Sequence, residues 1–176
     1  MRKSTWARIR AAIIALCAAA AVAWIIARPS VPALNDFDRY VFVPSRGAPE
    51  VTVIDSRTDK VVATIGLKAV AGQVVVSPAV GKLVATDPRA KTLSIVNLET
   101  REIDLVIPLD IKPDYMQMSP DGYLLAVGDV SAGAVSIISL QQRRQLSRVE
   151  GLSEPYNLRF NVDGSTIYVA NLGADH

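Results

Sequence analysis

Residues 116–127 read Met-Gln-Met-Ser-Pro-Asp-Gly-Tyr-Leu-Leu-Ala-Val, which is a short apolar run, a turn and a second apolar run. Parts of this stretch recur at one fixed step along the chain. Ser119-Pro120 matches Ser77-Pro78, and Asp121-Gly122 matches Asp163-Gly164. A step of about 42 residues lies in the range of about 20 to 50 that indicates an array of identical structural units, none of which can bury its apolar face alone.

Each unit is predicted to contain four short strands, because apolar and β-branched runs alternate with turn residues at intervals of about ten residues. In the unit that begins at residue 116, the strands are expected at 116–118, 124–127, 135–138 and 144–149. Proline presets φ for the first turn, and Gly122 accepts a positive φ there. The corresponding strands elsewhere are expected at 40–43, 51–54, 60–65, 74–76, 82–85, 93–96, 102–107, 158–160 and 166–169.

Four antiparallel strands in about 42 residues, repeated along the chain, are typical of a β-propeller blade. We therefore predict an all-β fold, a partial β-propeller of about three and a quarter four-stranded blades after an N-terminal hydrophobic helix. The blades are expected at 40–73 (incomplete), 74–115, 116–157 and 158–176, where a fourth blade starts. Closed propellers have about four to eight blades, so either the parent protein is longer or copies assemble into a ring. Unpaired blade edges would also permit self-association.

Two stretches carry a more specific pattern than the strand spacing. Ser-Pro-Asp-Gly at 119–122 is followed by an apolar run, and residues 162–175 read Val-Asp-Gly-Ser-Thr-Ile-Tyr-Val-Ala-Asn-Leu-Gly-Ala-Asp. These motifs resemble the YVTN family of β-propeller repeats, with Ala170 where the family's naming tetrapeptide usually has Thr. Residues 53–65 look like the second half of the same repeat. The resemblance covers residues 40–176 and implies a propeller that serves as an interaction platform or an accessory domain.

Residues 1–33 have the layout of an export segment. Residues 1–10 carry four positive charges, and residues 11–27 form an apolar run without a charged residue. This layout predicts a signal peptide or a signal anchor, with an apolar helix at 11–27. The run reaches the lower limit of about 17 to 25 residues for a membrane span, which favours the anchor, whereas small residues at Val31 and Ala33 suit cleavage.

Either reading of this export segment places the rest of the chain on the periplasmic or extracellular side of the membrane, because the positive charges stay in the cytoplasm. An uncleaved leader would tether the chain to the inner membrane through residues 11–27. Residues 34–39, which are rich in polar side chains, are then expected to form a linker between the leader and the repeats.

The net charge of +2 does not extend to the body of the chain. Five basic residues lie within the stretch 1–33, which contains no acidic residue, so acidic residues outnumber basic ones in the body. Nucleic-acid binding requires a basic stripe or patch, so we expect no nucleic-acid partner.

Cysteine and histidine occur once each, as Cys17 and His176. Nucleophile–base triads, imidazole-rich metal sites and haem ligation therefore lack their residues in this sequence. Enzyme chemistry would have to use carboxylates such as Asp87 and Asp129. We predict no catalytic residue, no metal and no cofactor, and an enzymatic role stays open as the less favoured alternative.

Ligand-binding candidates lie in the loops that join the second strand of a blade to the third, and the fourth strand to the next blade. Asp87, Asp129 and Asn171 occupy equivalent positions and could form an arc of oxygen ligands for a hard cation or for ligand hydroxyls. The alternative is that each residue caps the turn after its own strand. Tyrosines in these loops could line a binding site or could simply lie half buried under a loop. The remaining candidates are Tyr115, Tyr156 and Asn157.

The function predicted from these observations is an exported binding or scaffold platform for a protein or small-molecule partner on the loop side of the blades. The enzymatic alternative follows from the resemblance, because similar repeats occur in lactone-hydrolysing proteins and in propeller subunits of periplasmic quinoprotein and haem oxidoreductases. A structural surface-layer protein is a third reading, which would require many more repeats than one ring holds.

Overall fold

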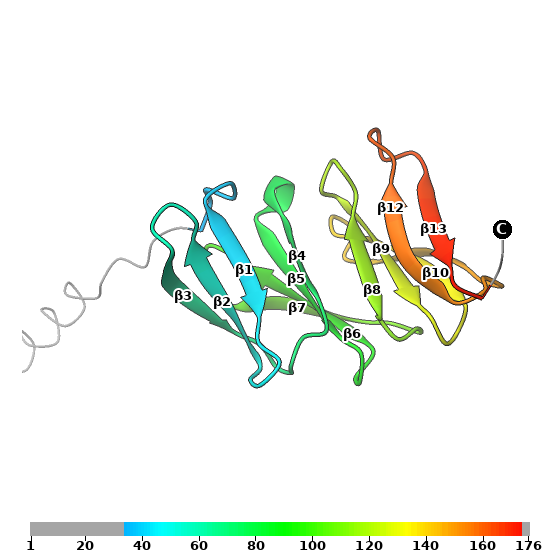
Figure 1. Ribbon diagram of the computed structural model, residues 1–176, viewed down its shortest axis with the longest axis horizontal. Helices are drawn as coiled ribbons and strands as arrows, with labels where there is room; N and C mark the ends of the chain where they lie inside the picture. Colours follow the sequence, from blue (N-terminus) through cyan, green and yellow to red (C-terminus); the bar gives the residue numbers. More distant parts are fainter. Residues whose placement is uncertain (1–33, 174–176) are drawn as a thin grey trace, which may run out of the picture. The chain divides into compact units, whose positions relative to one another are not determined.

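The computed structural model describes residues 34–173, which form thirteen β-strands and one short 3-10 helix, Pro78–Val80 (Figure 1). The strands belong to four antiparallel sheets, here called blades one to four. The predicted all-β fold with four-stranded antiparallel units is confirmed. Blade one is β1 (Tyr40–Pro44), β2 (Glu50–Asp55) and β3 (Lys60–Gly66); blade two is β4 (Val74–Ser77), β5 (Lys82–Asp87), β6 (Thr92–Asn97) and β7 (Ile103–Pro108); blade three is β8 (Tyr115–Met118), β9 (Leu124–Asp129), β10 (Ala134–Ser139) and β11 (Arg144–Val149); blade four is β12 (Pro155–Phe160) and β13 (Ile167–Asn171).

The predicted strands follow these bounds closely, and the largest difference is the start of β12, at Pro155 instead of residue 158. Within each blade, strands that are consecutive in the chain are neighbours in the sheet. The first strands of blades two, three and four, which are β4, β8 and β12, lie next to one another across the blade boundaries, as Figure 1 also shows. The chain therefore places one blade after another in the order of the sequence.

Backbone irregularities recur at the same step as the sequence motifs. A β-bulge lies between Val53 and Ile54 in blade one, and blades two and three have bulges at the equivalent positions. In each of these three blades a residue in the turn before the last strand has a positive φ: 55° at Asp59, 61° at Arg101 and 57° at Arg143. The repeat is thus one of backbone conformation as well as of side-chain type.

Clusters of buried side chains lie at the boundaries between consecutive blades. The boundary between blades one and two contains Val51, Leu83 and Val96; that between blades two and three contains Val84, Ile95 and Leu125; that between blades three and four contains Ala126, Val135 and Leu158. Successive residues of a strand point to opposite faces of its sheet, so Leu83 packs toward blade one and Val84 toward blade three. A central blade is therefore buried on both faces, which explains its continuous apolar runs.

The first blade lacks this double burial. Val41 lies one repeat before Leu83, yet Val41 is 49% exposed and Leu83 is fully buried. The described residues contain no blade on the outer side of blade one, so the side chains that would meet it face solvent. The alternation of buried and exposed residues along β1 reflects packing on one face only.

A direct hydrogen bond joins the turns of blades two and three. The Ser77 hydroxyl, which is fully buried, donates to the Gly122 carbonyl oxygen at 2.6 Å. Gly122 has a φ of 77°, and a Cβ at this position would lie 2.9 Å from the Ser77 Oγ. The glycine of the Ser-Pro-Asp-Gly turn is therefore required by both its conformation and its contact with the preceding blade.

Residues 34–39, which were expected to form a linker, pack against blade one instead. Leu34 is 1% exposed and belongs to the cluster between blades one and two. The Arg39 guanidinium donates to Asp55 Oδ2 from Nε at 3.0 Å and from Nη2 at 2.5 Å. These hydrogen bonds from Arg39 hold the pKa of the buried Asp55 carboxyl at about 2, well below its ordinary value. The segment is therefore part of the folded body.

The predicted export segment lies outside the described residues, as do its apolar helix at 11–27 and residues 174–176. Within residues 34–173, no helix has the length and apolar character that crossing a membrane requires.

Candidate functional site

The candidate residues lie on one side of the blades, here called the loop face. It consists of the loops 45–49, 67–73, 88–91, 109–114, 130–133 and 150–154, together with the strand ends next to them. These loops join the second strand of a blade to the third, or the last strand to the next blade. Asp87, Asp129 and Asn171 end β5, β9 and β13 on this face, as predicted.

Asp87 caps the turn that follows its own strand. Its Oδ1 atom accepts hydrogen bonds from the backbone N–H groups of Arg89 and Ala90, both at 3.0 Å. This is the geometry of an Asx turn, in which the side chain replaces a backbone acceptor. The second carboxylate oxygen, Oδ2, has no hydrogen-bond partner among the described residues.

Asp129 caps its turn and also holds the loop that precedes blade three. Its Oδ1 accepts from the Ala132 N–H at 2.9 Å and from the Ser131 hydroxyl at 2.8 Å, and its Oδ2 accepts from the Lys112 N–H at 2.7 Å. The residue is 3% exposed. Burial opposes ionisation, but these hydrogen bonds together outweigh it and lower the pKa of Asp129 below its ordinary value.

The two asparagines have different surroundings. Asn171 Oδ1 is buried and has no hydrogen-bond partner within the described part of the chain. Asn157 is exposed, and its Oδ1 accepts a hydrogen bond from the Leu158 N–H at 2.8 Å. Asn157 follows a bulge in β12, so its side chain is fixed by local backbone geometry.

The structure brings the two tyrosines together. The ring centroids of Tyr115 and Tyr156 lie 4.8 Å apart, with the ring planes tilted by 56°. A side-chain hydrogen bond with Tyr156, and then burial, raise the pKa of Tyr115 above its ordinary value. Tyr156 remains 45% exposed, so the pair presents an aromatic surface at the boundary between blades three and four.

The carboxylates of the predicted arc are engaged in capping. Asp87 and Asp129 each give Oδ1 to their own turn, which is the alternative considered from the sequence. Among residues 34–173, no three His, Cys, Asp or Glu side chains are grouped in a way that could hold a metal ion.

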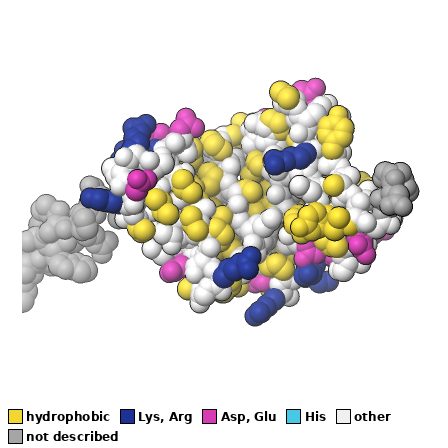
Figure 2. Space-filling model, in the orientation of Figure 1, with side chains coloured by type: hydrophobic (Ala, Val, Ile, Leu, Met, Phe, Trp, Pro, Cys, Tyr) yellow, Lys and Arg dark blue, Asp and Glu magenta, His cyan; other side chains and the backbone are white. Residues whose placement is uncertain are grey.

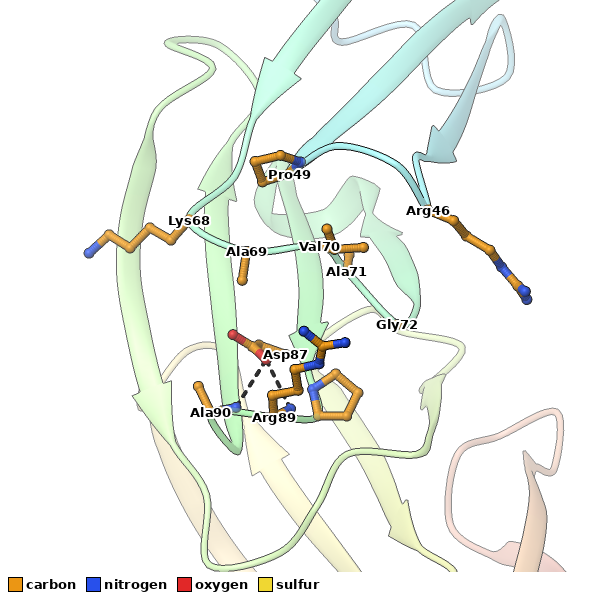
Figure 3. A pocket seen from close by; sticks show the side chains of 11 residues that line it. Arg46, Pro49, Lys68, Ala69, Val70, Ala71, Gly72, Asp87, Arg89 and Ala90 are labelled. Atoms are coloured by element: carbon orange, nitrogen blue, oxygen red, sulfur yellow. Dashed lines mark hydrogen bonds between the residues drawn. The ribbon is translucent and has the colours of Figure 1, made fainter.

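An open crevice of about 790 Å³ lies on the loop face between blades one and two (Figure 3). It is bounded by the loop that carries Lys68 and Gly72, by the turn from Asp87 to Ala90, and by Arg46 and Pro49 of the first loop. Arg46 and Lys68 are not among the site residues predicted from the sequence. Both lie in loops of the incomplete first blade, where no motif is repeated, so only their basic character could have drawn attention to them.

Basic side chains are not gathered on the face that Figure 2 displays. Lys and Arg (dark blue) lie scattered among Asp and Glu (magenta) and among apolar side chains (yellow). The lining of the crevice between blades one and two contains three cationic side chains and one carboxylate.

Comparison with known proteins shows the fold alone. No family model matches the chain, and no curated protein sequence matches it. Among solved structures, the chain is similar to hydrazine synthase from Kuenenia stuttgartiensis (TM-score 0.69, 19% identity, 77% of this chain and 40% of that one). It is also similar to a functionally unknown protein from Desulfotomaculum acetoxidans (TM-score 0.66, 18% identity, 77% and 46%). A third similar structure is the dihydro-haem d1 dehydrogenase NirN in complex with DHE (TM-score 0.64, 17% identity, 78% and 31%).

These similarities confirm the predicted β-propeller fold. The chain spans less than half the length of each of the three solved structures. The activities in their names belong to those proteins, because sequence identities as low as these carry fold and not function.

The double role of Asp129 leads to a test by mutation and pH. Asp129→Asn should lower the free energy of unfolding at pH 7 by about 1–3 kcal/mol, since one buried N–H loses its acceptor. The folded pKa of Asp129 lies below the unfolded value of about 3.9, so its stabilisation is complete above that pH and is lost as the pH falls below it. Urea unfolding should therefore show a smaller difference between the wild type and Asp129→Asn at pH 3 than at pH 7.

Asp87→Asn is the matched control for this test, because Asp87 occupies the same repeat position but accepts nothing from the preceding loop. It should cost less than Asp129→Asn. Equal costs for the two variants, or a difference that does not change with pH, would contradict the role given to Asp129.

Proposed function

We propose that this chain is an exported binding module built from YVTN-type β-propeller blades, whose loop face takes up a protein or small-molecule partner. The observation that carries this proposal is the crevice between blades one and two. Its volume of about 790 Å³ falls within the range of about 300–1,000 Å³ that is usual for small-molecule sites. Loops held on a rigid sheet scaffold are the usual place for binding residues.

The predicted site residues fit this proposal in two groups. Asp87 lines the crevice between blades one and two. The pair Tyr115 and Tyr156 offers an aromatic contact surface at the other end of the loop face, with Asn157 next to it. Asp129 supports its loop, and we assign Asn171 to the site on the strength of its buried and unsatisfied Oδ1.

An enzymatic propeller fragment, lactonase-like or related to quinoprotein or haem oxidoreductases, is the second candidate. Two of the similar solved structures are named as enzymes, a hydrazine synthase and a dihydro-haem d1 dehydrogenase. Residues 34–173 contain neither histidine nor cysteine, and the Oδ1 atoms of Asp87 and Asp129 are occupied by capping hydrogen bonds. We therefore favour binding without catalysis.

The proposed location is the periplasmic or extracellular side of the membrane, with the leader as an inner-membrane tether. It rests on the positive residues at 1–10 and the apolar run at 11–27. Alkaline phosphatase fused after His176 should be active in bacteria and should sediment with membranes. Activity found only in the soluble periplasm would replace the tether with a cleaved signal, and an inactive fusion would refute export.

A thermal-shift screen of the full chain in detergent against small metabolites tests the proposed binding role. At a concentration of about 100 times Kd, a ligand should stabilise the fold by about 2.7 kcal/mol, which is visible as a rise in Tm. The rise should be lost in Arg89→Gln or in Tyr156→Ala, which alter the two parts of the loop face.

The control for this screen is Lys60→Gln, at the start of β3 on the opposite side of the blades. It should keep the ligand-induced rise in Tm. A rise that survives both loop-face variants would place the site elsewhere, and chemical turnover of the ligand would favour the enzymatic candidate.

A further inference from the structure

We propose that the crevice between blades one and two binds a small dicarboxylate that carries a hydroxyl or amine donor next to one carboxylate. In this proposal Arg89 pairs with a carboxylate of the ligand, and Asp87 Oδ2 accepts a hydrogen bond from the donor. The inference rests on the proposed binding role of the loop face and names the ligand class for one part of it.

The basic residues of the crevice are available to a ligand. Arg46, Lys68 and Arg89 form no ion pair with any of the described residues, although all three line the crevice. One repeat further along the chain, the corresponding loop is neutralised internally, because Lys112 Nζ lies 2.6 Å from Asp114 Oδ1. The boundary between blades one and two therefore retains a positive surplus that the next boundary lacks, and this surplus attracts anions.

The three basic side chains have different positions in the crevice. In Figure 3 the Arg89 side chain extends from the turn toward the loop that carries Val70 and Ala71, across the space beside Asp87. Lys68 and Arg46 extend away on either side. Arg89 is thus the residue placed for a direct, bidentate contact with a carboxylate, and Lys68 and Arg46 contribute through their charge.

Asp87 supplies an acceptor that its repeat partner has already used. At the next boundary, Asp129 Oδ2 accepts the Lys112 N–H at 2.7 Å, so the loop closes onto the carboxylate. The residue one repeat before Lys112 is Val70, and no described backbone N–H reaches Asp87 Oδ2. Val70 is instead 43% exposed, and the space left by the open loop is the crevice.

These features together select the ligand class. Three cations and one carboxylate give the lining a formal surplus of two positive charges, which matches a dicarboxylate. An ionised carboxylate only accepts hydrogen bonds, so Asp87 Oδ2 requires a donor from the ligand and would repel a ligand carboxylate placed there. A hydroxyl or an ammonium group beside a carboxylate satisfies both requirements, and the crevice wall formed by Ala69, Ala71 and Pro88 suits a short carbon chain.

Titration calorimetry of the full chain with three matched probes tests this inference. L-Malate, L-aspartate and succinate share a four-carbon dicarboxylate skeleton and differ only in carrying a hydroxyl, an ammonium or no donor. At least one of the first two should bind about 10-fold or more tightly than succinate, because a site with an open acceptor discriminates against a ligand without a donor. Which of the two binds identifies the donor as hydroxyl or amine.

Variants then separate the two contacts. Arg89→Gln should weaken binding of the preferred probe by about 10-fold or more, whereas Arg46→Gln should weaken it less. Asp87→Asn keeps the acceptor that caps the turn and removes the open carboxylate oxygen, so it should bring the preferred probe and succinate to equal affinity. Ala69→Phe, which fills the crevice without altering the core, should abolish binding. This variant tests the crevice independently of Asp87→Asn, so the test stands if Asp87→Asn fails to fold. Lys60→Gln should leave all affinities unchanged.

Equal binding of the three probes by the wild type would overturn the inference, as would no binding of any probe or a preference that survives Asp87→Asn. None of these results tests the proposed binding role of the loop face, which the thermal-shift screen tests separately. A metabolite whose stabilisation is lost in Tyr156→Ala but kept in Arg89→Gln would support that role and refute the crevice as its site.

Discussion

Burial of each sheet face against the neighbouring blade is the constraint on which this structure depends. Consecutive residues of β5, such as Leu83 and Val84, are both fully buried because they pack against different blades. A slip of one residue in strand register would exchange the two faces, so the same repeat step must be kept in every blade. The Ser77–Gly122 hydrogen bond fixes the same register at the turns. No blade is stable on its own, and each one completes the core of the next.

The same repetition allows the loops of the loop face to differ in sequence from blade to blade. The turns after β5 and β9 are each capped by their own Asx residue, Asp87 and Asp129, so these strands are held whether or not the neighbouring loop closes over them. Between blades two and three the loop closes onto Asp129, and between blades one and two it leaves a basic crevice. Small differences in loop sequence therefore change the chemistry of a boundary without disturbing its core, which is how a repeat fold acquires a specific site.

The sequence was sufficient for the fold because the repeat sets both the turns and the alternation of buried faces. It also identified Asp87 and its equivalence to Asp129, but not that one carboxylate is closed over and the other open, because this depends on the conformation of each loop. The crevice residues Arg46 and Lys68 could not be predicted from the sequence, because the loops of the first blade carry no repeated motif. Leu34 was assigned to a linker because its polar neighbours mask the single apolar side chain that enters the core.

The most direct test of the central claim measures how much the packing between blades contributes to stability. Leu125 on β9 is fully buried at the boundary between blades two and three, whereas Val149 on β11 of the same blade is 53% exposed. In urea unfolding of the full chain, Leu125→Ala should lower the free energy of unfolding by about 2–5 kcal/mol, and Val149→Ala by less than about 1 kcal/mol. Similar losses for the two variants would contradict the account, because they would mean that stability does not come from burial between the blades.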